Sequence, residues 1–412
     1  MIGALNPEVK TPNIDNLVKR GTTFTHCFIM GGTQAAICAP SRAMLMTGRN
    51  LFNVPDSIVE IPGADDPSLA TLPETLKNAG YETFMTGKWH SSKKTFKRSF
   101  TGGSRIFFGG MSNHLQMPIH DFDPTGEYPK EKLRIEKKFS SELFSDSAVD
   151  FLKNYRGDKP FFAYVAYTSP HDPRMAPKKY CDYYRNQDLK LPSNFLPEHP
   201  FDNGELKIRD ELLAPFPRTP EVIKEHLAAY YAMVSEVDAQ IGRVLDALKE
   251  SGHDKDTIIV FGSDNGLAVG QHGLMGKQSL YEHSLRVPLI ICGPGLPEGQ
   301  KSGALVHLHD VFPTLCELLK MKTPPTVQSS SLVPVLKNQT AKVRDRIVGA
   351  YINIQRCVRE EEWKLIVYRV KGKETIQLFN IKDDPWETDN LSVKPEFADR
   401  ISRMREQLIE WS

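Results

Sequence analysis

An alternation of helical segments with short apolar strands constrains this chain more than any other feature. Helices are expected at 11–21, 69–79, 141–155, 221–250 and 311–319, and strands at 22–28, 81–86, 161–167, 257–262 and 287–292. Strands that read as continuous apolar runs are buried on both faces, and the helices between them supply the cover. The pattern predicts an α/β fold with a largely parallel central sheet and helices on both faces.

The pattern changes near residue 345. Two hairpin-like runs at 363–370 and 375–381 precede a helix at about 396–411. We therefore expect an α/β domain over residues 1–344 and a small α+β domain with an antiparallel sheet over 345–412. Within the first domain, residues 91–138 lose periodicity and predict a long irregular insert near the site, and residues 172–220 form a proline-rich excursion.

Bulk composition excludes several classes of protein. The 412 residues are 40% hydrophobic and 25% charged with a net charge of +1, so neither nucleic acid nor an anionic membrane is expected as the main partner. No apolar run approaches the ~20 residues of a membrane span. The six cysteines include no C-x-x-C pair, which gives neither a zinc signature nor a disulfide framework. The residues after Met1 do not have the pattern of a signal peptide.

Residues 36–49, AICAPSRAMLMTGR, place one cysteine at the start of an expected helix. Pro40 suits the first turn because its missing N–H needs no partner there, and Gly48 marks the end. Cys38 therefore lies at a helix N-terminus, which favours an anion, and Arg42 adds a positive charge one turn later. Taken alone, a cysteine is more often a small buried hydrophobe.

Further polar residues follow the carboxyl ends of expected strands. Lys88 and His90 follow one strand, His171 follows a second, Asp264 and Asn265 follow a third, and Lys277 comes shortly after. Open α/β sheets bind ligands at this edge. Each cluster also has a structural interpretation, since a single histidine is usually structural and Asp-Asn-Gly is often a turn.

These motifs together resemble the sulfatase family of the alkaline phosphatase superfamily. C-A-P-S-R followed by A-M-L-M-T-G-R resembles its first signature, and G-Y-E-T-F-M-T-G-K-W-H resembles its second. P-H-D-P, S-D-N-G with the downstream lysine, and Q-L-F-N-I-K-D-D-P-W-E-T-D-N-L resemble further blocks of the family. The resemblance covers essentially the whole chain and implies a sulfuric ester hydrolase with an alkaline-phosphatase-like sheet.

The resemblance implies a modified nucleophile. Cys38 would be oxidised to formylglycine (3-oxoalanine) by a formylglycine-generating enzyme, which reads Pro40 and Arg42. The hydrate of this aldehyde would attack sulfur, and Arg42 would hold it in place. His90 would then act as the base that regenerates the aldehyde, since imidazole titrates near neutral pH.

The resemblance implies roles for the other site residues in the same way. Lys88 and Lys277, with the metal, would hold the sulfate oxygens, and His171, assisted by Lys277, would protonate the leaving oxygen. Asp264 and Asn265 would join residue 38 as oxygen ligands of Ca²⁺, with Mg²⁺ as the second choice.

Three further histidines are weaker candidates. His272, in G-Q-H-G, fits a pocket wall or a loop-stabilising role equally well. His307 and His309 flank the start of a helix and are expected to be structural.

The chain departs from the family at its start. Family members carry a central apolar strand ending in two aspartates just before the region that matches residues 2–6, and neither is present in this sequence. The pairs Asp65–Asp66 and Asp383–Asp384 do not follow an apolar run and are not promoted to metal ligands. Asp264, Asn265 and residue 38 alone cannot supply the 6 to 8 oxygens usual for calcium.

Two hypotheses explain this departure. In the favoured one, Met1 is an internal methionine of a longer protein that includes a signal peptide, the strand and the aspartates. In the other, the chain is a degenerate, non-catalytic homologue that binds sulfated sugar weakly or not at all. A missing central strand leaves backbone groups of its neighbours unpaired, so poor solubility of the 412-residue chain is expected.

The substrate class also stays open between two chemistries. A sulfated small molecule or glycan, above all a carbohydrate, is expected, and a phosphonate or phosphate monoester is the alternative within the superfamily. A periplasmic or secreted location is expected from the family if a signal peptide was lost.

Overall fold

The computed structural model describes residues 2–54 and 66–411, and its first sheet has β1 (Thr22–Phe28) at its centre. β1 runs parallel to β10 (Gln300–Ser302) and β11 (Val306–His307) and antiparallel to β9 (Arg286–Cys292), which pairs antiparallel with β8 (Ile259–Gly262). The pairing is therefore mixed, whereas the sequence predicted a largely parallel sheet. Apolar runs show that a strand is buried but not in which direction it pairs.

A second sheet is parallel throughout. β3 (Glu82–Lys88) lies between β4 (Gly102–Phe107) and β7 (Phe161–Ala166). β4 belongs to the segment that was predicted as a long irregular insert, and that prediction is wrong there. The sequence of β4, GGSRIF, has little strand propensity, and its backbone is ordered by pairing with β3 rather than by local preference.

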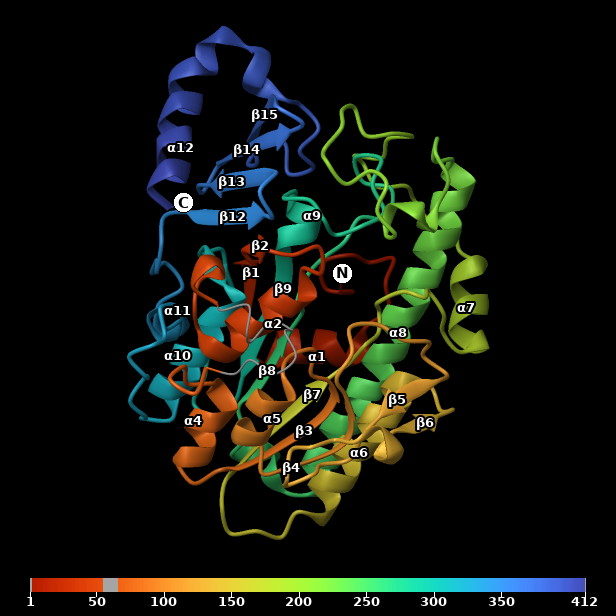
Figure 1. Ribbon diagram of the computed structural model, residues 1–412, viewed down its shortest axis with the longest axis vertical. Helices are drawn as coiled ribbons and strands as arrows, with labels where there is room; N and C mark the ends of the chain where they lie inside the picture. Colours follow the sequence, from red (N-terminus) through yellow and green to blue (C-terminus); the bar gives the residue numbers. More distant parts are fainter. Residues whose placement is uncertain (1, 55–65, 412) are drawn as a thin grey trace.

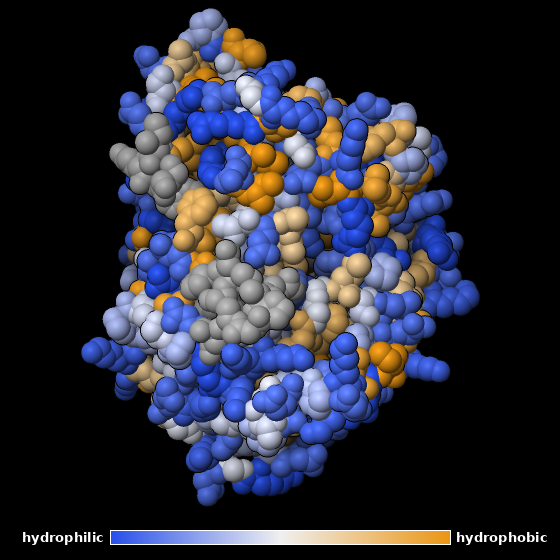
Figure 2. Space-filling model, in the orientation of Figure 1, coloured by the Kyte–Doolittle hydropathy of each residue, from blue (hydrophilic) through white to orange (hydrophobic). Residues whose placement is uncertain are grey.

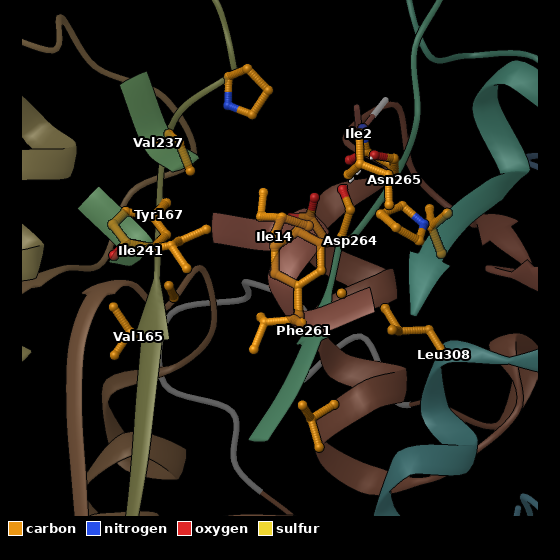
Figure 3. A pocket seen from close by; sticks show the side chains of 18 of the residues that line it. Ile2, Ile14, Val165, Tyr167, Val237, Ile241, Phe261, Asp264, Asn265 and Leu308 are labelled. Carbon is orange, nitrogen blue, oxygen red and sulfur yellow. Dashed lines mark hydrogen bonds between the residues drawn. The ribbon is translucent and has the colours of Figure 1, made fainter. Parts of the chain in front are cut away.

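The two sheets approach each other along β7 and β8. Within the described part of the chain, each of these strands pairs with one neighbour only. A cavity of about 1740 Å³ lies against both, lined by apolar side chains that include Val165, Ile241 and Phe261. Figure 3 shows Val165 and Ile241 on one side of this cavity and Phe261 on the other. One edge strand of each sheet therefore borders this cavity, which we call the slot.

Helices cover both faces of the first sheet. Successive side chains of β9 show this, because they pack alternately into two different core clusters. Leu289 and Ile291 of β9 belong to the main core, whereas Ile290 and Cys292 pack with α1 (Pro12–Arg20) and α8 (Pro220–Glu250). Side chains of a strand point to opposite faces in turn, so both faces of β9 are buried against helices.

The long helix α8 organises one side of the molecule (Figure 1). It begins at Pro220, and the side chain of the preceding residue, Thr219, caps it by accepting a hydrogen bond from the Val222 N–H. α6 (Ser140–Asn154), α7 (Lys178–Arg185) and α1 pack against it. Asp238 of α8 accepts hydrogen bonds from the backbone N–H groups of Asn13 and Ile14, which fixes the start of α1 on α8.

A second group of helices completes the α/β part. α2 (Cys38–Thr47) packs with α4 (Leu72–Asn78) and with α10 (Val311–Leu318), and side chains of all three belong to the described core clusters. A capping box of Thr71 and Glu74 starts α4. The remaining short α-helices and strands of the described residues are α5 (Lys93–Ser99), α9 (Glu282–Leu285), α11 (Val333–Lys337), β2 (Gly31–Gly32), β5 (Met117–Ile119) and β6 (Arg134–Glu136).

The C-terminal part contains the predicted antiparallel sheet. It is a meander of β12 (Ile347–Tyr351), β13 (Gln355–Arg359), β14 (Trp363–Val370) and β15 (Lys373–Asn380), packed against α12 (Ala398–Trp411). β12 also pairs in parallel with β2 of the N-terminal part. The division at residue 344 stays a prediction, because one sheet of the structure crosses it.

The α/β class and the antiparallel C-terminal sheet are confirmed, and β1 and β14 have the predicted bounds. Among the described residues no helix is both long and apolar enough to cross a bilayer. Hydrophilic residues dominate the lower part of the face in Figure 2, and hydrophobic residues gather in its upper half.

Candidate active site

Cys38 occupies the first turn of α2, as the sequence predicted. The helix ends at Gly48, whose left-handed backbone (φ 65°) lets its N–H donate to the carbonyl of Met44. The Cys38 side chain is buried, and its Sγ lies 3.4 Å from Nδ1 of His90. A helix N-terminus and an imidazole therefore meet at one sulfur atom.

The surroundings of Cys38 favour a negative charge. Burial by itself raises the pKa of the thiol, but the hydrogen bond with His90 and the charges of Lys88 and Lys277 outweigh it and lower the pKa to about 6. A thiol with this pKa is largely ionised at neutral pH. The same position would stabilise any other anionic group bound there.

Arg42 ties three elements of the site together. Its Nε donates to Oδ2 of Asp264 at 2.7 Å, and its Nη1 donates to the carbonyl oxygen of Lys88 at 2.6 Å and to the hydroxyl of Tyr164 at 3.4 Å. Burial raises the pKa of Asp264, but the charges of Arg42 and Lys88 prevail and hold it well below its usual range. Asp264 is therefore a carboxylate held by a guanidinium.

The end of β3 presents Lys88 and His90 to the site. Gly87 has φ 93°, and a Cβ at this position would lie 2.0 Å from the carbonyl oxygen of Ala166, so only glycine fits. Lys88 is buried, which lowers its pKa, while the neighbouring Cys38 opposes that shift. Gly110 leaves room for the His90 ring, since a Cβ there would lie 2.7 Å from its Nε2.

His171 and Lys277 form the opposite side of the site. Nε2 of His171 lies 3.0 Å from Nζ of Lys277, although the two residues come from loops after different strands. Nδ1 of His171 lies 2.9 Å from the carbonyl oxygen of Asp172 and 3.2 Å from its carboxylate. Burial and the charge of Lys277 lower the pKa of His171 to about 4, so the ring is neutral at pH 7.

The charges of the arrangement as a whole favour an anion. Arg42, Lys88 and Lys277 supply three cations, and Asp264 supplies one carboxylate that is already paired. Arg42, Lys88, His171 and Lys277 all line the cavity beside β7 and β8. The structure thus brings the predicted site residues together, and the role of each stays a prediction.

The predicted metal ligands do not form a complete metal site by themselves. Oδ2 of Asp264 is taken by Arg42, and Nδ2 of Asn265 donates to the carbonyl of Gly266. The described ranges hold no group of three or more His, Cys, Asp or Glu that could bind a metal. Calcium usually takes 6 to 8 oxygens, so the donors present among the described residues do not fit it.

The described residues of the acidic pairs elsewhere form hydrogen bonds within turns. Asp66 accepts hydrogen bonds from Ser68, and Asp384 accepts them from Thr388 and Asp389 in a C-terminal turn. Asp65 lies outside the described residues.

The weaker histidine candidates have structural contacts. The ring of His272 stacks on Tyr281 with centroids 3.9 Å apart, and its Nε2 lies 3.0 Å from Nδ2 of Asn194. These contacts favour the loop-stabilising role. His307 and His309 stack on each other at 4.8 Å, and both are buried.

Sequence reasoning missed several residues that contact the site. Tyr164 lies on β7 and contacts Arg42. Asp172 of the P-H-D-P motif follows His171 directly, and its carboxylate contacts the His171 ring. Arg209 and Asp210 come from the proline-rich excursion and lie against Asp172 and Gln278. Asp172 could have been found from its neighbour His171, but no local signal marks Arg209.

Comparisons with known proteins fit this geometry. The sulfatase family model matches residues 2–321, and the model of the N-sulphoglucosamine sulphohydrolase C-terminal region matches 270–412. An N-acetylglucosamine-6-O-sulfatase of Bacteroides thetaiotaomicron is 26% identical over 471 residues, covering 98% of this chain and 82% of the relative.

Solved structures extend the comparison to the fold. One protein in complex with its substrate D-glucosamine-2-N,6-O-disulfate superposes with a TM-score of 0.80 at 24% identity, covering 98% of this chain and 92% of that chain. A phosphonate monoester hydrolase from Silicibacter pomeroyi superposes with a TM-score of 0.76 at 21% identity, covering 99% of this chain and 91% of that chain. At these identities the two structures show a shared fold.

Proposed function

Because the chain belongs to the sulfatase family, whose family model matches residues 2–321, we propose that it cleaves the sulfate ester of a sulfated carbohydrate with a nucleophile made from Cys38. One observation carries this proposal. Sγ of Cys38 lies beside Nδ1 of His90, within the field of Lys88 and Lys277, at a helix N-terminus. The names of a relative and of a bound substrate support the choice of a sulfated sugar.

Binding of the sulfate group falls to the cations. Lys88 and Lys277 are buried, and a buried ammonium group interacts strongly with an anion because little water screens it. Arg42 is held by Asp264 and by the Lys88 carbonyl, so it adds a fixed positive charge. Fixed cations stabilise the charge on the sulfate oxygens as the ester bond breaks.

Residue 38 supplies the nucleophile in this proposal. A formylglycine formed from Cys38 would supply, as its hydrate, the hydroxyl oxygen that attacks sulfur. Nδ1 of His90 lies 3.4 Å from Sγ of Cys38, and this distance supports His90 as the base that takes a proton from a group on residue 38. Lys88 and Lys277 favour the anionic form of that group, as they favour the thiolate.

The leaving oxygen needs a proton, and in this proposal His171 supplies it. The ring is neutral in the free site because burial and Lys277 lower its pKa to about 4. A bound sulfate ester adds a negative charge beside Lys277, which offsets this repulsion and raises the proton affinity of His171. Lys277, 3.0 Å away, can donate to His171 or directly to the leaving oxygen.

The proposal also includes a further strand in the slot between β7 and β8. The slot between β7 and β8 borders two strands with one partner each, and Ile2 lies beside Asn265 at one end of it (Figure 3). A strand that ends at Ile2 would run parallel to β7 and β8. Carboxylates at the end of this strand would lie beside Asp264 and Asn265. They would add oxygen atoms toward the number that calcium usually binds.

Two parts of the proposal rest on the family alone. Modification of Cys38 requires a formylglycine-generating enzyme as a partner, and export to the periplasm or outside the cell requires a signal segment. Both are tested by isolating the protein from its own source and locating it by cell fractionation.

Top-down mass spectrometry of the isolated protein tests the main proposal. We expect a longer N-terminus with paired aspartates and a residue 38 lighter than cysteine by the mass change to the aldehyde. An N-terminus at Met1 with an unmodified thiol would contradict the proposal and favour a non-catalytic homologue, which would bind sulfated glycans without releasing sulfate.

A second candidate is hydrolysis of a phosphonate or phosphate monoester. The observation that favours it is the fold shared with a phosphonate monoester hydrolase, together with a cation cluster that would also hold a phosphoryl group. Rates on 4-nitrophenyl sulfate and on phenyl phosphonate esters separate the two. We expect the sulfate to be preferred, with Cys38→Ala inactive and Cys316→Ala, a buried cysteine in α10, as the control.

A further inference from the structure

Asp172 connects His171 to a neighbouring loop. One carboxylate oxygen of Asp172 lies 3.2 Å from Nδ1 of His171, and the other lies 2.7 Å from Nη1 of Arg209. Nη2 of Arg209 lies 3.4 Å from the first oxygen, so the guanidinium faces the carboxylate with both of its terminal nitrogens. Two-point contact of this kind fixes orientation as well as distance.

Arg209 is itself held by the next residue. Its Nε donates to Oδ1 of Asp210 at 3.0 Å, and Oδ2 of Asp210 accepts a hydrogen bond from Nε2 of Gln278 at 3.0 Å. Asp210 is buried, whereas the Arg209 side chain is 48% exposed. Gln278 directly follows Lys277, and its Oε1 accepts from the Lys277 N–H. The contact therefore reaches the loop that carries Lys277.

Glu211 makes a second connection to that loop. Its carboxylate accepts hydrogen bonds from the backbone N–H groups of Met275 and Gly276, both at 2.9 Å. Arg218 neutralises Glu211, and both residues are buried. A buried carboxylate bound to two successive N–H groups leaves that stretch of backbone little freedom.

We propose that Arg209, Asp210 and Glu211 form a clamp that fixes His171 and Lys277 relative to each other, with Arg209 acting on His171 through Asp172. Arg209 is thus a positioning residue, since it contacts Asp172 rather than the reacting atoms. This inference rests on the proposed function of His171 and Lys277 as the groups that protonate the leaving oxygen. The inference assigns a role to residues 209–211, a short segment of the proline-rich excursion for which the sequence predicted no role.

The clamp has a specific chemical consequence. A proton donor accelerates ester cleavage most when the leaving alkoxide is a strong base, as a sugar hydroxyl is, and least for a phenolate such as 4-nitrophenolate. Loosening the His171–Lys277 pair should therefore slow hydrolysis of sugar sulfates while sparing nitrophenyl sulfate. A general loss of folding would slow both.

The charges around His171 give a readout that does not need turnover. Lys277, Lys88 and Arg209 are the cations that face its ring or its carboxylate partner, Asp172 is the anion, and His114 donates to its carbonyl. Removing Arg209 leaves the charge of Asp172 uncompensated next to Nδ1. The protonation midpoint of His171 should then rise.

Arg209→Met is the test variant, and Arg403→Met is the matched control. Arg403 also faces a carboxylate with two nitrogens, at 2.9 and 3.1 Å from Glu360, and its side chain is 51% exposed, but it lies on α12. On the full-length protein we expect Arg209→Met to lose roughly 10- to 100-fold in kcat on a glucosamine sulfate and much less on 4-nitrophenyl sulfate. Arg403→Met should match the parent on both.

Nitrogen NMR of the His171 ring, assigned with His171→Asn, gives the independent measurement. We expect a higher protonation midpoint in Arg209→Met and recovery toward the parent in Arg209→Lys. Equal losses on both esters, or an unchanged His171 midpoint, would overturn the clamp. If the parent hydrolyses neither ester, the proposed function fails, and the NMR comparison still decides whether Arg209 acts on His171. Should Arg209→Met fail to fold, Arg209→Gln, which also removes the positive charge, carries the same comparison.

Discussion

Nε of Arg42 lies 2.7 Å from Oδ2 of Asp264, and this pair joins α2 to the end of β8. The Arg42 side chain is 9% exposed and that of Asp264 is 24% exposed, so water screens the pair only in part. The contact connects residues that are far apart in the sequence and serves both the fold and the charge of the site.

We expect Arg42→Ala to destabilise the fold by about 3 kcal/mol, because it leaves a largely buried carboxylate without its main partner. The double variant Arg42→Ala/Asp264→Ala should cost less than the sum of the two single changes. Urea unfolding of the four proteins measures this coupling. Additive effects would show that the pair contributes no interaction energy.

Gly87 and Gly80 allow a matched test of the turn that delivers Lys88. Both have φ 93°, but a Cβ at Gly80 meets nothing within 4 Å, whereas at Gly87 it lies 2.0 Å from the Ala166 oxygen. Gly80→Ala should cost only the left-handed strain of about 1 kcal/mol. Gly87→Ala should cost roughly 3 kcal/mol or more because β3 must move away from β7. Thermal unfolding compares the two, and equal losses would contradict the steric explanation.

Buried histidines should make stability depend on pH. Burial lowers the pKa of His199 to about 4, against an ordinary value of 6.5. Between these values the unfolded chain binds a proton that the folded chain does not, so stability falls as pH drops from 6.5 toward 4. His199 alone should contribute a slope of up to about 1.4 kcal/mol per pH unit.

His199→Asn isolates this contribution, since the amide can still donate to the His272 carbonyl that Nδ1 of His199 now contacts. Urea unfolding at several pH values should show that the free energy of unfolding depends less steeply on pH in the variant. The difference should correspond to the uptake of about one proton fewer on unfolding. An identical slope would mean that His199 is not protonated on unfolding in this range.

The slot beside β7 and β8 should bind a hydrophobic dye in the 412-residue chain. The slot is lined largely by apolar side chains, and uncovered apolar surface of this kind binds hydrophobic dyes and promotes self-association. Ile241→Ser, in the lining, should lower the fluorescence of bound anilinonaphthalene sulfonate. Val393→Ser, at a side chain 79% exposed in the C-terminal part, should not. A monomeric chain with a cooperative, high-temperature melt and no dye binding would contradict this prediction.

The sequence by itself determined the local elements and the position of Cys38. Helical spacing of apolar residues placed α8 within one residue of its observed start, and the proline and glycine of the 36–49 stretch placed Cys38 in the first turn of α2. These predictions succeed because burial of one helix face and the backbone limits of proline and glycine act over a few neighbouring residues. The motifs also identified the family, which the comparisons confirm.

Only the tertiary structure decided which strands pair and which side chains meet. β9 reads as a buried strand whichever way it runs, and its antiparallel pairing with β1 is set by contacts between distant residues. β4 becomes a strand because β3 offers it hydrogen-bond partners. Arg209 reaches Asp172 across 37 positions of chain, and no periodicity in that proline-rich stretch records the contact. Pairing direction and long-range charge contacts depend on how the whole chain packs, so they leave no signal in a short window of sequence.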